Sequence, residues 1–327
     1  MALLDDLTSK AKSKYPRILL PESTDSRIIA AAKSIKDQKI AQIVLFDEES
    51  ASSLGLESIN PKNEDLKAQY AQTLFELRKH KGVTVESALE MLSNKSVFAM
   101  MALQRGDVDG VVTGAITPSQ EVLSNALRIV GVAEGSKLVS SLFLMVFDDN
   151  HSMYGGNLIF SDCAMNINPN SEELAEIAKS AYEAAQSFLT QSPKLAMLSF
   201  STNQSAKHAE VDKVREATEL LRSSLPDINV IGNVQLDAAL DPDVLKINDS
   251  DSSFLPPANV FIFPNLAAGN ITYKMLQSFG AAEAIGPMLI GTKNSAHVLQ
   301  LGASVREIVN MATLAAVDAR NRKVKKV

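Results

Sequence analysis

Short apolar runs separated by polar, glycine-containing or helical segments predict an α/β protein. Each apolar run is rich in β-branched or aliphatic residues and is short enough for a buried strand. The clearest of them lie at residues 17–20, 40–46, 108–115, 139–147, 195–202 and 260–263. Helical patterns follow at residues 27–36, 67–80 and 172–189, and a turn is expected at Asp148-Asp149-Asn150. This alternation predicts a parallel sheet with helices on both faces.

The segment after residue 259 combines a strand, a small polar loop and a helix. Val260–Phe263 is apolar, Pro264 ends it, and Asn265–Asn270 is expected to be a loop that contains Gly269. Backbone N–H groups at the start of the following helix would then face an anion such as phosphate. The pattern alone also fits an ordinary βα unit. Further on, Ser304 is well placed to cap the helix that contains Glu307.

Composition limits the classes of function. The chain has 327 residues, of which 46% are hydrophobic and 21% charged, enough for one large domain or two of ordinary size. Its formal net charge of −6 argues against a nucleic-acid-binding protein, because no basic surplus faces phosphates along a duplex. A local basic pocket for one anionic ligand stays compatible with that charge.

No apolar run is long enough to span a bilayer, and the N-terminus has no signal-peptide pattern, so we expect a cytoplasmic protein without a membrane segment. The single cysteine, Cys163, permits no internal disulfide. A buried structural thiol is favoured over a nucleophile there, because no histidine lies in a recognisable partner motif. Four scattered histidines give no metal-ligand spacing, and no metal site is expected.

Several phrases carry a family resemblance. VFIFPNLAAGNITYK, at residues 260–274, closely resembles the phosphate acetyltransferase signature, with Asn265 for the usual acid and Thr272 for the usual glycine. LLPESTDSRIIAAA near the N-terminus, VDKVREA in the middle and GASVREIV near the C-terminus match the family in the same order. The chain is thereby identified as a member of the phosphate acyltransferase family. That family includes the acetyltransferase-like domain fused to some malic enzymes.

The resemblance implies a phosphate acetyltransferase that transfers acetyl reversibly between coenzyme A and phosphate. A carboxylate base would generate the thiolate that attacks directly, with coenzyme A or acetyl-CoA as substrate and no permanently bound cofactor. It also implies a homodimer and a two-domain fold like that of isocitrate and isopropylmalate dehydrogenases, with parallel or mixed sheets. Residues 1–135 with 287–327 would form domain I, residues 136–286 would form domain II, and the cleft between them would hold the active site.

Residues that match the family's motifs are the expected site. Glu307 stands where the family has its catalytic aspartate, one methylene longer, and Gln300 replaces the family's serine as an amide donor. Arg78 would contact phosphate or coenzyme A, although a basic residue at a helix C-terminus also suits the helix dipole. Thr117 and Ser119 would donate to phosphate or, alternatively, cap a helix.

Further substrate contacts are expected from the remaining matched phrases, namely Ser201, Thr202, Asn270 and Lys274. Glu22, in the N-terminal phrase, is either catalytic or structural, and the structural role is favoured. In the second half, Asn203 and Gln204 replace a Lys-Gly pair, while Ile231 and Asn233 replace an Asp and a Glu.

Two arginines of the family are missing. Ser124 and Leu301 occupy their positions, and Arg128 lies one helical turn beyond Ser124 on a neighbouring face. All three are included among the expected substrate contacts. Three interpretations stay open: an active acetyltransferase, a catalytically impaired homologue that binds acyl-CoA or an anion and regulates a partner, or a transferase with a different acyl preference. The lost arginines favour the second, and the apolar Leu301 favours the third.

Overall fold

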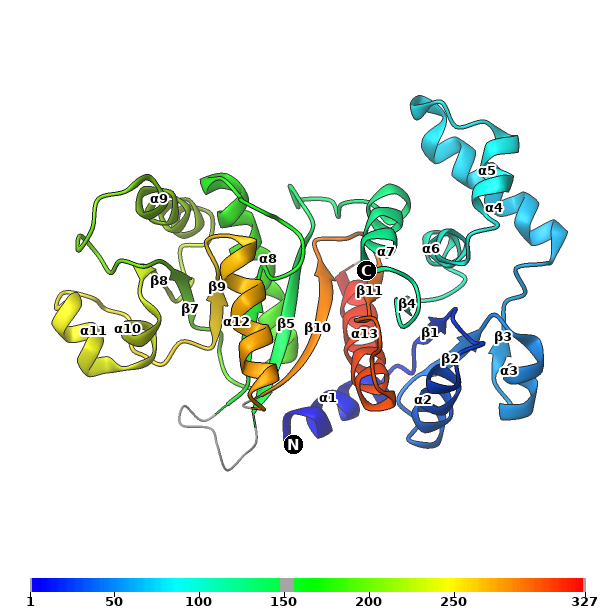
Figure 1. The fold of residues 1–327 in the computed structure, drawn as a ribbon, viewed down its shortest axis with the longest axis horizontal. Coiled ribbons are helices and arrows are strands. Elements are labelled where there is room, and N and C mark those ends of the chain that lie inside the picture. The colour runs from blue at the N-terminus through cyan, green and yellow to red at the C-terminus, as the bar shows by residue number, and fades with distance from the viewer. Residues whose placement is uncertain (1, 148–155, 281, 326–327) are drawn as a thin grey trace. The chain divides into compact units, whose positions relative to one another are not determined.

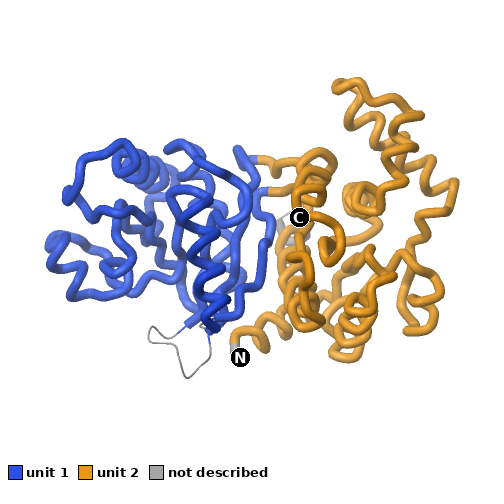
Figure 2. The backbone as a smooth tube through the Cα atoms, in the orientation of Figure 1, with its two compact units in different colours: residues 1, 135–291 blue, residues 2–134, 292–327 orange. Residues whose placement is uncertain are grey.

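The computed structural model describes residues 2–147, 156–280 and 282–325, arranged in two compact units. Unit 1 is the continuous segment Gly135–Gly291, and unit 2 combines Ala2–Glu134 with Thr292–Val327 (Figures 1 and 2). The turn expected at Asp148-Asp149-Asn150 lies outside the described residues.

The sheet of unit 2 is entirely parallel, in the strand order β3-β2-β1-β4-β11. Its strands are β1 (Arg17–Leu20), β2 (Gln42–Leu45), β3 (Glu57–Ser58), β4 (Gly110–Thr113) and β11 (Ser295–Val298). Strand β4 lies between β1 and β11, with Gly110 level with both Ile18 and Ser295. Because the three strands are parallel neighbours, their carboxyl ends lie at one edge of the sheet.

Unit 2 also contains eight α-helices in the described part of the chain. They are α1 (Ala2–Lys12), α2 (Ser26–Asp37), α3 (Glu48–Leu54), α4 (Glu64–Arg78), α5 (Val85–Met91), α6 (Lys95–Arg105), α7 (Ser119–Asn125) and α13 (Val305–Lys325). A short 3₁₀ turn, Lys79–Lys81, follows α4, and a π-helical turn, Ala126–Val130, continues α7. The long helix α13 packs against α1, α2, β4 and β11 through a buried apolar face.

The sheet of unit 1 is mixed, in the order β10-β5-β6-β9-β7-β8. Its strands are β5 (Ser140–Phe147), β6 (Leu158–Ser161), β7 (Leu195–Leu198), β8 (Val230–Val234), β9 (Val260–Ile262) and β10 (Ala282–Ile290). Strand β5 runs antiparallel to β10 and β6, whereas the remaining neighbours are parallel.

Five helices of the described part of unit 1 accompany the sheet: α8 (Ser171–Phe188), α9 (Ala209–Ser224), α10 (Leu236–Leu240), α11 (Pro242–Asn248) and α12 (Leu266–Ser278). Aromatic rings fill the core beneath α12. Phe143 stacks on Tyr273 with ring centroids 3.9 Å apart, and Phe160 meets Phe261 and Phe263 edge to face. Such pairs add to the stabilisation from apolar burial.

The predicted α/β class is confirmed, and most predicted strands overlap observed ones. The expected strand at 17–20 coincides with β1, and Asp25 caps α2, its carboxylate accepting from the Arg27 N–H. One prediction about local structure is wrong. Residues 266–270 are not a loop but the first turn of α12, which Asn265 caps by accepting a hydrogen bond from the Ala268 N–H.

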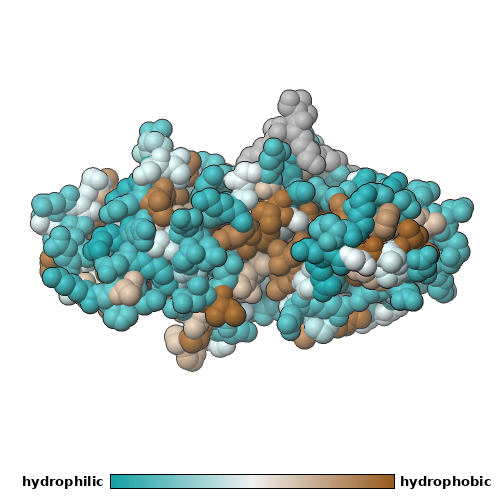
Figure 3. Space-filling view, turned by 90° about the horizontal axis from the view of Figure 1, so that it is seen from above, coloured by the Kyte–Doolittle hydropathy of each residue, from teal (hydrophilic) through white to brown (hydrophobic). Residues whose placement is uncertain are grey.

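Within the described part of the chain, no helix is both long enough and apolar enough to cross a bilayer. The face of the molecule seen in Figure 3 is largely hydrophilic, with hydrophobic side chains gathered in several groups.

Candidate functional site

Three loops of unit 2 meet at the carboxyl edge of its sheet. Residues 21–25 follow β1, residues 114–118 follow β4, and residues 299–304 connect β11 to α13. Crevices at the carboxyl ends of parallel strands are the usual ligand sites of α/β sheets. Most site residues predicted for this unit lie on or directly after these loops.

Glu22 organises the loop after β4. Its buried carboxylate accepts four backbone hydrogen bonds: from Gly114 and Ala115 at 2.9 Å each, from Ile116 at 3.1 Å and from Thr117 at 2.8 Å. The Thr117 hydroxyl donates to the same carboxylate at 2.7 Å. The sequence favoured a structural role for Glu22, and these contacts support it. Thr117, expected either to donate to phosphate or to cap a helix, donates to Glu22.

The turn after β11 is bound to the same loop. The Leu299 N–H donates to the Thr113 carbonyl at 2.8 Å, and Gly302 donates to Ala115 at 3.4 Å. Gly114 has a φ of +117°, and a Cβ there would lie 2.8 Å from the Leu299 carbonyl oxygen. Only glycine suits this close approach.

Arg27, on the first turn of α2, ties the two loops together. Its guanidinium donates to the Ala303 carbonyl at 2.9 Å and to the Ala115 carbonyl at 3.2 Å. Asp25 holds the guanidinium through a salt bridge of 2.7 Å. The hydrogen bond from Arg27 lowers the pKa of the Asp25 carboxyl below its usual value. The three loops therefore form one hydrogen-bonded assembly.

Glu307 lies at the third position of α13 and closes a capping box. Its Oε2 accepts from the Ser304 N–H at 2.7 Å, while the Ser304 hydroxyl accepts from the Glu307 N–H at 3.3 Å. The predicted cap at Ser304 is thus confirmed. The S-x-x-E spacing was visible in the sequence and would have indicated this second role of Glu307.

Gln300 and Leu301 lie in the turn itself. Gln300 is half-buried, and its carbonyl accepts from the Ala303 N–H at 3.0 Å. Leu301 exposes 60% of its surface. These two side chains stand at the edge of the loop assembly.

Arg128 folds back onto Ser124. Its Nε and Nη2 donate to the Ser124 hydroxyl at 3.0 and 2.6 Å. Arg128 belongs to the π-helical turn that continues α7, a distortion that is frequent at functional sites. An exposed guanidinium therefore lies beside the residue that replaces the family arginine.

Ser119 is the first residue of α7, and Pro118 is its N-cap, so the alternative that Ser119 is a capping residue is wrong. Arg78 is the last residue of α4, a half-buried position at the helix C-terminus. In the described part of the chain, no hydrogen bond or ion pair joins Arg78 to the three loops. Helices α4 and α5 lie at the opposite side of unit 2 from α13 (Figure 1).

Ser201 and Thr202, in unit 1, are buried in the turn after β7 and are engaged there. The Ser201 hydroxyl lies 2.8 Å from the hydroxyl of Ser205, and the Thr202 hydroxyl accepts from the Gln235 N–H at 3.0 Å. Asn233 completes the turn by donating to the Ser201 carbonyl at 2.9 Å. The structure therefore gives both hydroxyls a role in shaping this turn.

Asn270 and Lys274 lie one turn apart on α12. The Asn270 amide donates to the Cys163 carbonyl at 3.2 Å, whereas Lys274 is exposed, with its ammonium 5.3 Å from the Tyr273 ring centroid. Gly269 lets the helix approach the turn after β6, because a Cβ there would lie 2.5 Å from the Asp162 carbonyl oxygen. Asn270 thus helps dock α12, and only Lys274 presents a charge to solvent.

The Cys163 thiol is buried in this packing. Burial and the adjacent charge of Asp162 raise its pKa well above the ordinary value. Since the thiolate is the nucleophilic form, this environment suits a structural cysteine.

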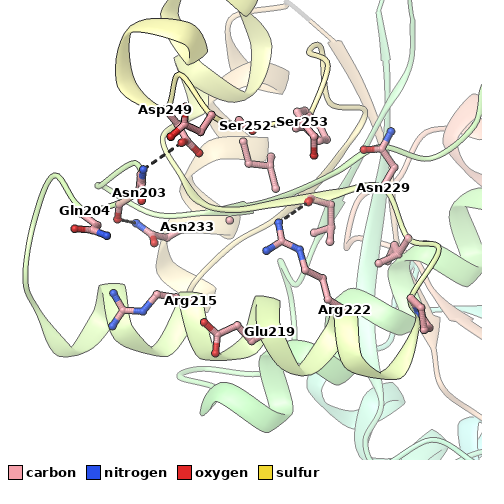
Figure 4. A pocket seen from close by; sticks show the side chains of 17 residues that line it. Asn203, Gln204, Arg215, Glu219, Arg222, Asn229, Asn233, Asp249, Ser252 and Ser253 are labelled. Atoms are coloured by element: carbon pink, nitrogen blue, oxygen red, sulfur yellow. Dashed lines mark hydrogen bonds between the residues drawn. The ribbon is translucent and has the colours of Figure 1, made fainter.

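Unit 1 also contains a polar pocket of about 590 Å³ along the edge strand β8 (Figure 4). Asn203 donates to Asp249 at 3.1 Å, and Asn233 donates to the Asn203 carbonyl at 3.2 Å across its rim. Arg215 and Arg222 of α9 border it from the other side. Its lining includes four of the positions that depart from the family phrases, Asn203, Gln204, Ile231 and Asn233. None of the predicted site residues lines it.

Among the described residues, no group of three or more histidine, cysteine, aspartate or glutamate side chains is arranged to hold a metal ion.

Comparison with known proteins agrees with the resemblance in the sequence. The family described as "Phosphate acetyl/butaryl transferase" matches residues 2–316, and the chain belongs to that family. A phosphate acetyltransferase from Thermoanaerobacterium thermosaccharolyticum is 40% identical over 98% of this chain and 100% of its own length. One from Acetivibrio thermocellus is 38% identical over 98% and 99%. A solved phosphotransacetylase from Streptococcus pyogenes superposes with a TM-score of 0.88 at 36% identity and covers 98% of both chains.

Proposed function

We propose that this protein is a phosphate acetyltransferase that moves acetyl groups reversibly between coenzyme A and phosphate. One observation carries the proposal for an active enzyme over an impaired homologue. The guanidinium of Arg128 donates twice to the Ser124 hydroxyl, so a positive charge is present beside the position where the family arginine is missing. A guanidinium there is suited to phosphate, which it binds through paired hydrogen bonds.

The remaining roles follow from the loop assembly of unit 2. Glu307 Oε2 accepts the hydrogen bond from the Ser304 N–H. We therefore assign Oε1 of Glu307 as the base that takes the proton from the coenzyme A thiol. The resulting thiolate attacks the carbonyl carbon of acetyl phosphate, the negative charge moves to the carbonyl oxygen, and the carbon–oxygen bond to phosphate then breaks. The Gln300 amide would donate to that oxygen, while Ser119 and Arg128 would hold the departing phosphate.

The test is thioester formation from acetyl phosphate and coenzyme A, comparing the unmodified protein with Arg128→Ala and Arg128→Lys. Loss of a charge contact to the leaving phosphate should lower kcat/KM by about a hundredfold, the effect expected for one transition-state contact. Arg128→Lys should recover part of the activity, because lysine keeps the charge but not the paired geometry. Arg105→Ala, which removes an exposed arginine that donates to Thr73, is the matched control.

Two results would contradict the proposal in different ways. Equal rates for the unmodified protein and Arg128→Ala would remove Arg128 from the site while leaving the transferase intact. No turnover by the unmodified protein, with acetyl-CoA still bound in calorimetry, would favour the binding homologue.

The impaired homologue keeps one observation in its favour. The carboxylate that replaces the catalytic aspartate is also the reciprocal partner in the capping box of α13, so part of its hydrogen-bonding capacity is used within the protein. A regulatory acyl-CoA-binding protein would retain that cap without using it for proton transfer. Glu307→Gln separates the two functions, because the amide oxygen still accepts from Ser304 but no longer takes up a proton.

A different acyl preference is supported by Leu301, which presents an apolar side chain where the family has arginine. Comparing acetyl, propionyl and butyryl phosphates would reveal it as a ratio of kcat/KM values.

We also propose a cytoplasmic homodimer whose two units correspond to the domains of the isocitrate/isopropylmalate dehydrogenase-like fold. An exposed stripe of Ile271, Met275 and Phe279 on α12 supports the dimer, because contiguous apolar side chains of this size mark association surfaces. The division of the chain into two compact units supports the domain assignment. The single cysteine is compatible with the reducing cytoplasm.

A further inference from the structure

Glu22 is the most heavily engaged side chain at the carboxyl edge of the unit 2 sheet. The residue is only 3% exposed, and its carboxylate accepts five hydrogen bonds from within the protein, at distances between 2.7 and 3.1 Å. Four of the five donors are consecutive backbone N–H groups. Consecutive amides that converge on one point form a nest that binds anions.

The nest is therefore filled by an anion of the protein itself. The donors lie 92 to 95 residues after Glu22 and belong to the loop that follows the neighbouring strand β4. A carboxylate on the surface would accept hydrogen bonds from water, whereas the Glu22 carboxylate accepts them from the loop at residues 114–117. A nest occupied in this way cannot also hold the phosphate of a substrate, which must bind on the outer side of the loop.

The same loop is hydrogen-bonded to the turn that contains Gln300. Gly302 donates to the carbonyl of Ala115, whose N–H donates to Glu22. Arg27 bridges the Ala115 and Ala303 carbonyls. A shift of the 114–117 loop would thus displace both the Thr117 hydroxyl and the turn at residues 299–304.

We propose that Glu22 is a positioning residue for acyl transfer, an internal anion that fixes the 114–117 loop and, through it, the turn that carries Gln300. This inference rests on the proposed function, since the loops it positions are those assigned to phosphate and to the oxyanion. Glu22 itself touches no reacting atom.

The decisive experiment is chemical rescue. Glu22→Ala empties the nest, and formate supplies a carboxylate small enough to fill it. We expect Glu22→Ala to lower kcat and raise the KM for phosphate, with a combined loss of about a hundredfold, the scale of a misplacement of about 1 Å. Formate should restore a large part of that loss. Glu22→Gln should not be rescued, because its amide fills the space and points a donor at backbone donors.

Asp109→Asn is the matched control. Asp109 lies just before the amino end of β4 and accepts from the Arg17 N–H at 2.9 Å, so it joins the same two strands at the opposite edge of the sheet. Asp109→Asn should lower thermal stability while leaving KM and kcat within about twofold of the unmodified values. A substitution far from the site affects folding rather than catalysis. Formate should have no effect on it.

Hydrogen exchange of the peptide 113–120 provides a readout that needs no activity. Glu22→Ala should accelerate exchange there, and formate should slow it again. If the unmodified protein transfers acetyl but Glu22→Ala keeps its kinetic constants, the positioning role is wrong and the proposed function stands. If the unmodified protein transfers no acetyl, the proposed function fails, and unchanged exchange in Glu22→Ala would then overturn the loop assignment as well.

Discussion

The roles of several single residues depend on hydrogen-bond partners that lie far away in the sequence. The sequence left open whether Arg128, four residues after Ser124, reaches the position of the missing arginine. In the structure its guanidinium donates to the Ser124 hydroxyl. The sequence favoured a structural role for Glu22 but could not identify its hydrogen-bond donors, which come from a different βα unit. It also placed Thr117 on phosphate without knowing that its hydroxyl donates to Glu22. Local spacing predicts local contacts, and the remaining contacts follow only from the order of strands in the sheet.

Asp318 illustrates a buried charge held by its neighbours. Its carboxylate, 16% exposed, accepts from Arg322 Nε at 2.8 Å and lies 3.2 Å from His297 Nε2. Burial alone would raise the pKa of Asp318, but Arg322 and His297 together hold that pKa far below its usual range. A depressed folded-state pKa stabilises the fold fully above the unfolded value of about 4 and loses that contribution as pH falls below it.

Asp318→Asn should therefore lower the free energy of unfolding at pH 7 by about 3 kcal/mol, because the Arg322 guanidinium loses the carboxylate charge that pairs with it. Chemical denaturation between pH 3 and pH 7 would measure this. The difference between variant and unmodified protein should shrink as the pH falls below about 4. A constant difference across that range would mean that packing, rather than charge, is what the substitution removes.

Helices and strands with a clear hydrophobic pattern could be predicted from the sequence. Segments that pack through small residues could not. Strand β1 (Arg17–Leu20) was evident as an apolar run before a proline, and α8 as a long amphipathic pattern. The start of α12 was missed, because Leu266 to Gly269 resembles a small-residue loop. Gly269 is there because the turn at Asp162 lies against the helix, a contact between segments more than 100 residues apart.

Gly269→Ala tests that docking. In an isolated helix alanine is favoured over glycine by about 1 kcal/mol. In α12 the added methyl group would lie 2.5 Å from the Asp162 carbonyl oxygen, so the helix must move away, at a cost of about 1–3 kcal/mol. We expect a lower melting temperature than for Ser278→Ala, an exposed change at the end of the same helix. A melting temperature that rises instead would mean that α12 is not tightly docked there.

At the scale of the whole molecule, the outer face of α12 and its C-cap present an exposed apolar stripe. Ile271, Met275 and Phe279 recur every four residues and so form one stripe, and Phe279 is 81% exposed. Helix α12 docks its opposite side through Gly269 and Tyr273, so the stripe does not serve the core. Burying it against a second copy would remove apolar surface from water, worth about 25 cal/mol per Å² before the costs of association.

We therefore expect the unmodified protein to be a dimer in solution and Phe279→Glu to shift it toward monomer, measured as molar mass by light scattering across a concentration series. A two-fold interface presents the same stripe from both subunits, so one substitution introduces two charges. Ile247→Glu is the matched control, because Ile247 is equally exposed but lies on α11. A dimer that survives Phe279→Glu would place the interface elsewhere, and a monomeric unmodified protein would remove the dimer from the proposal. If the monomer still transfers acetyl at the unmodified rate, each subunit holds a complete site, and the stripe serves assembly alone.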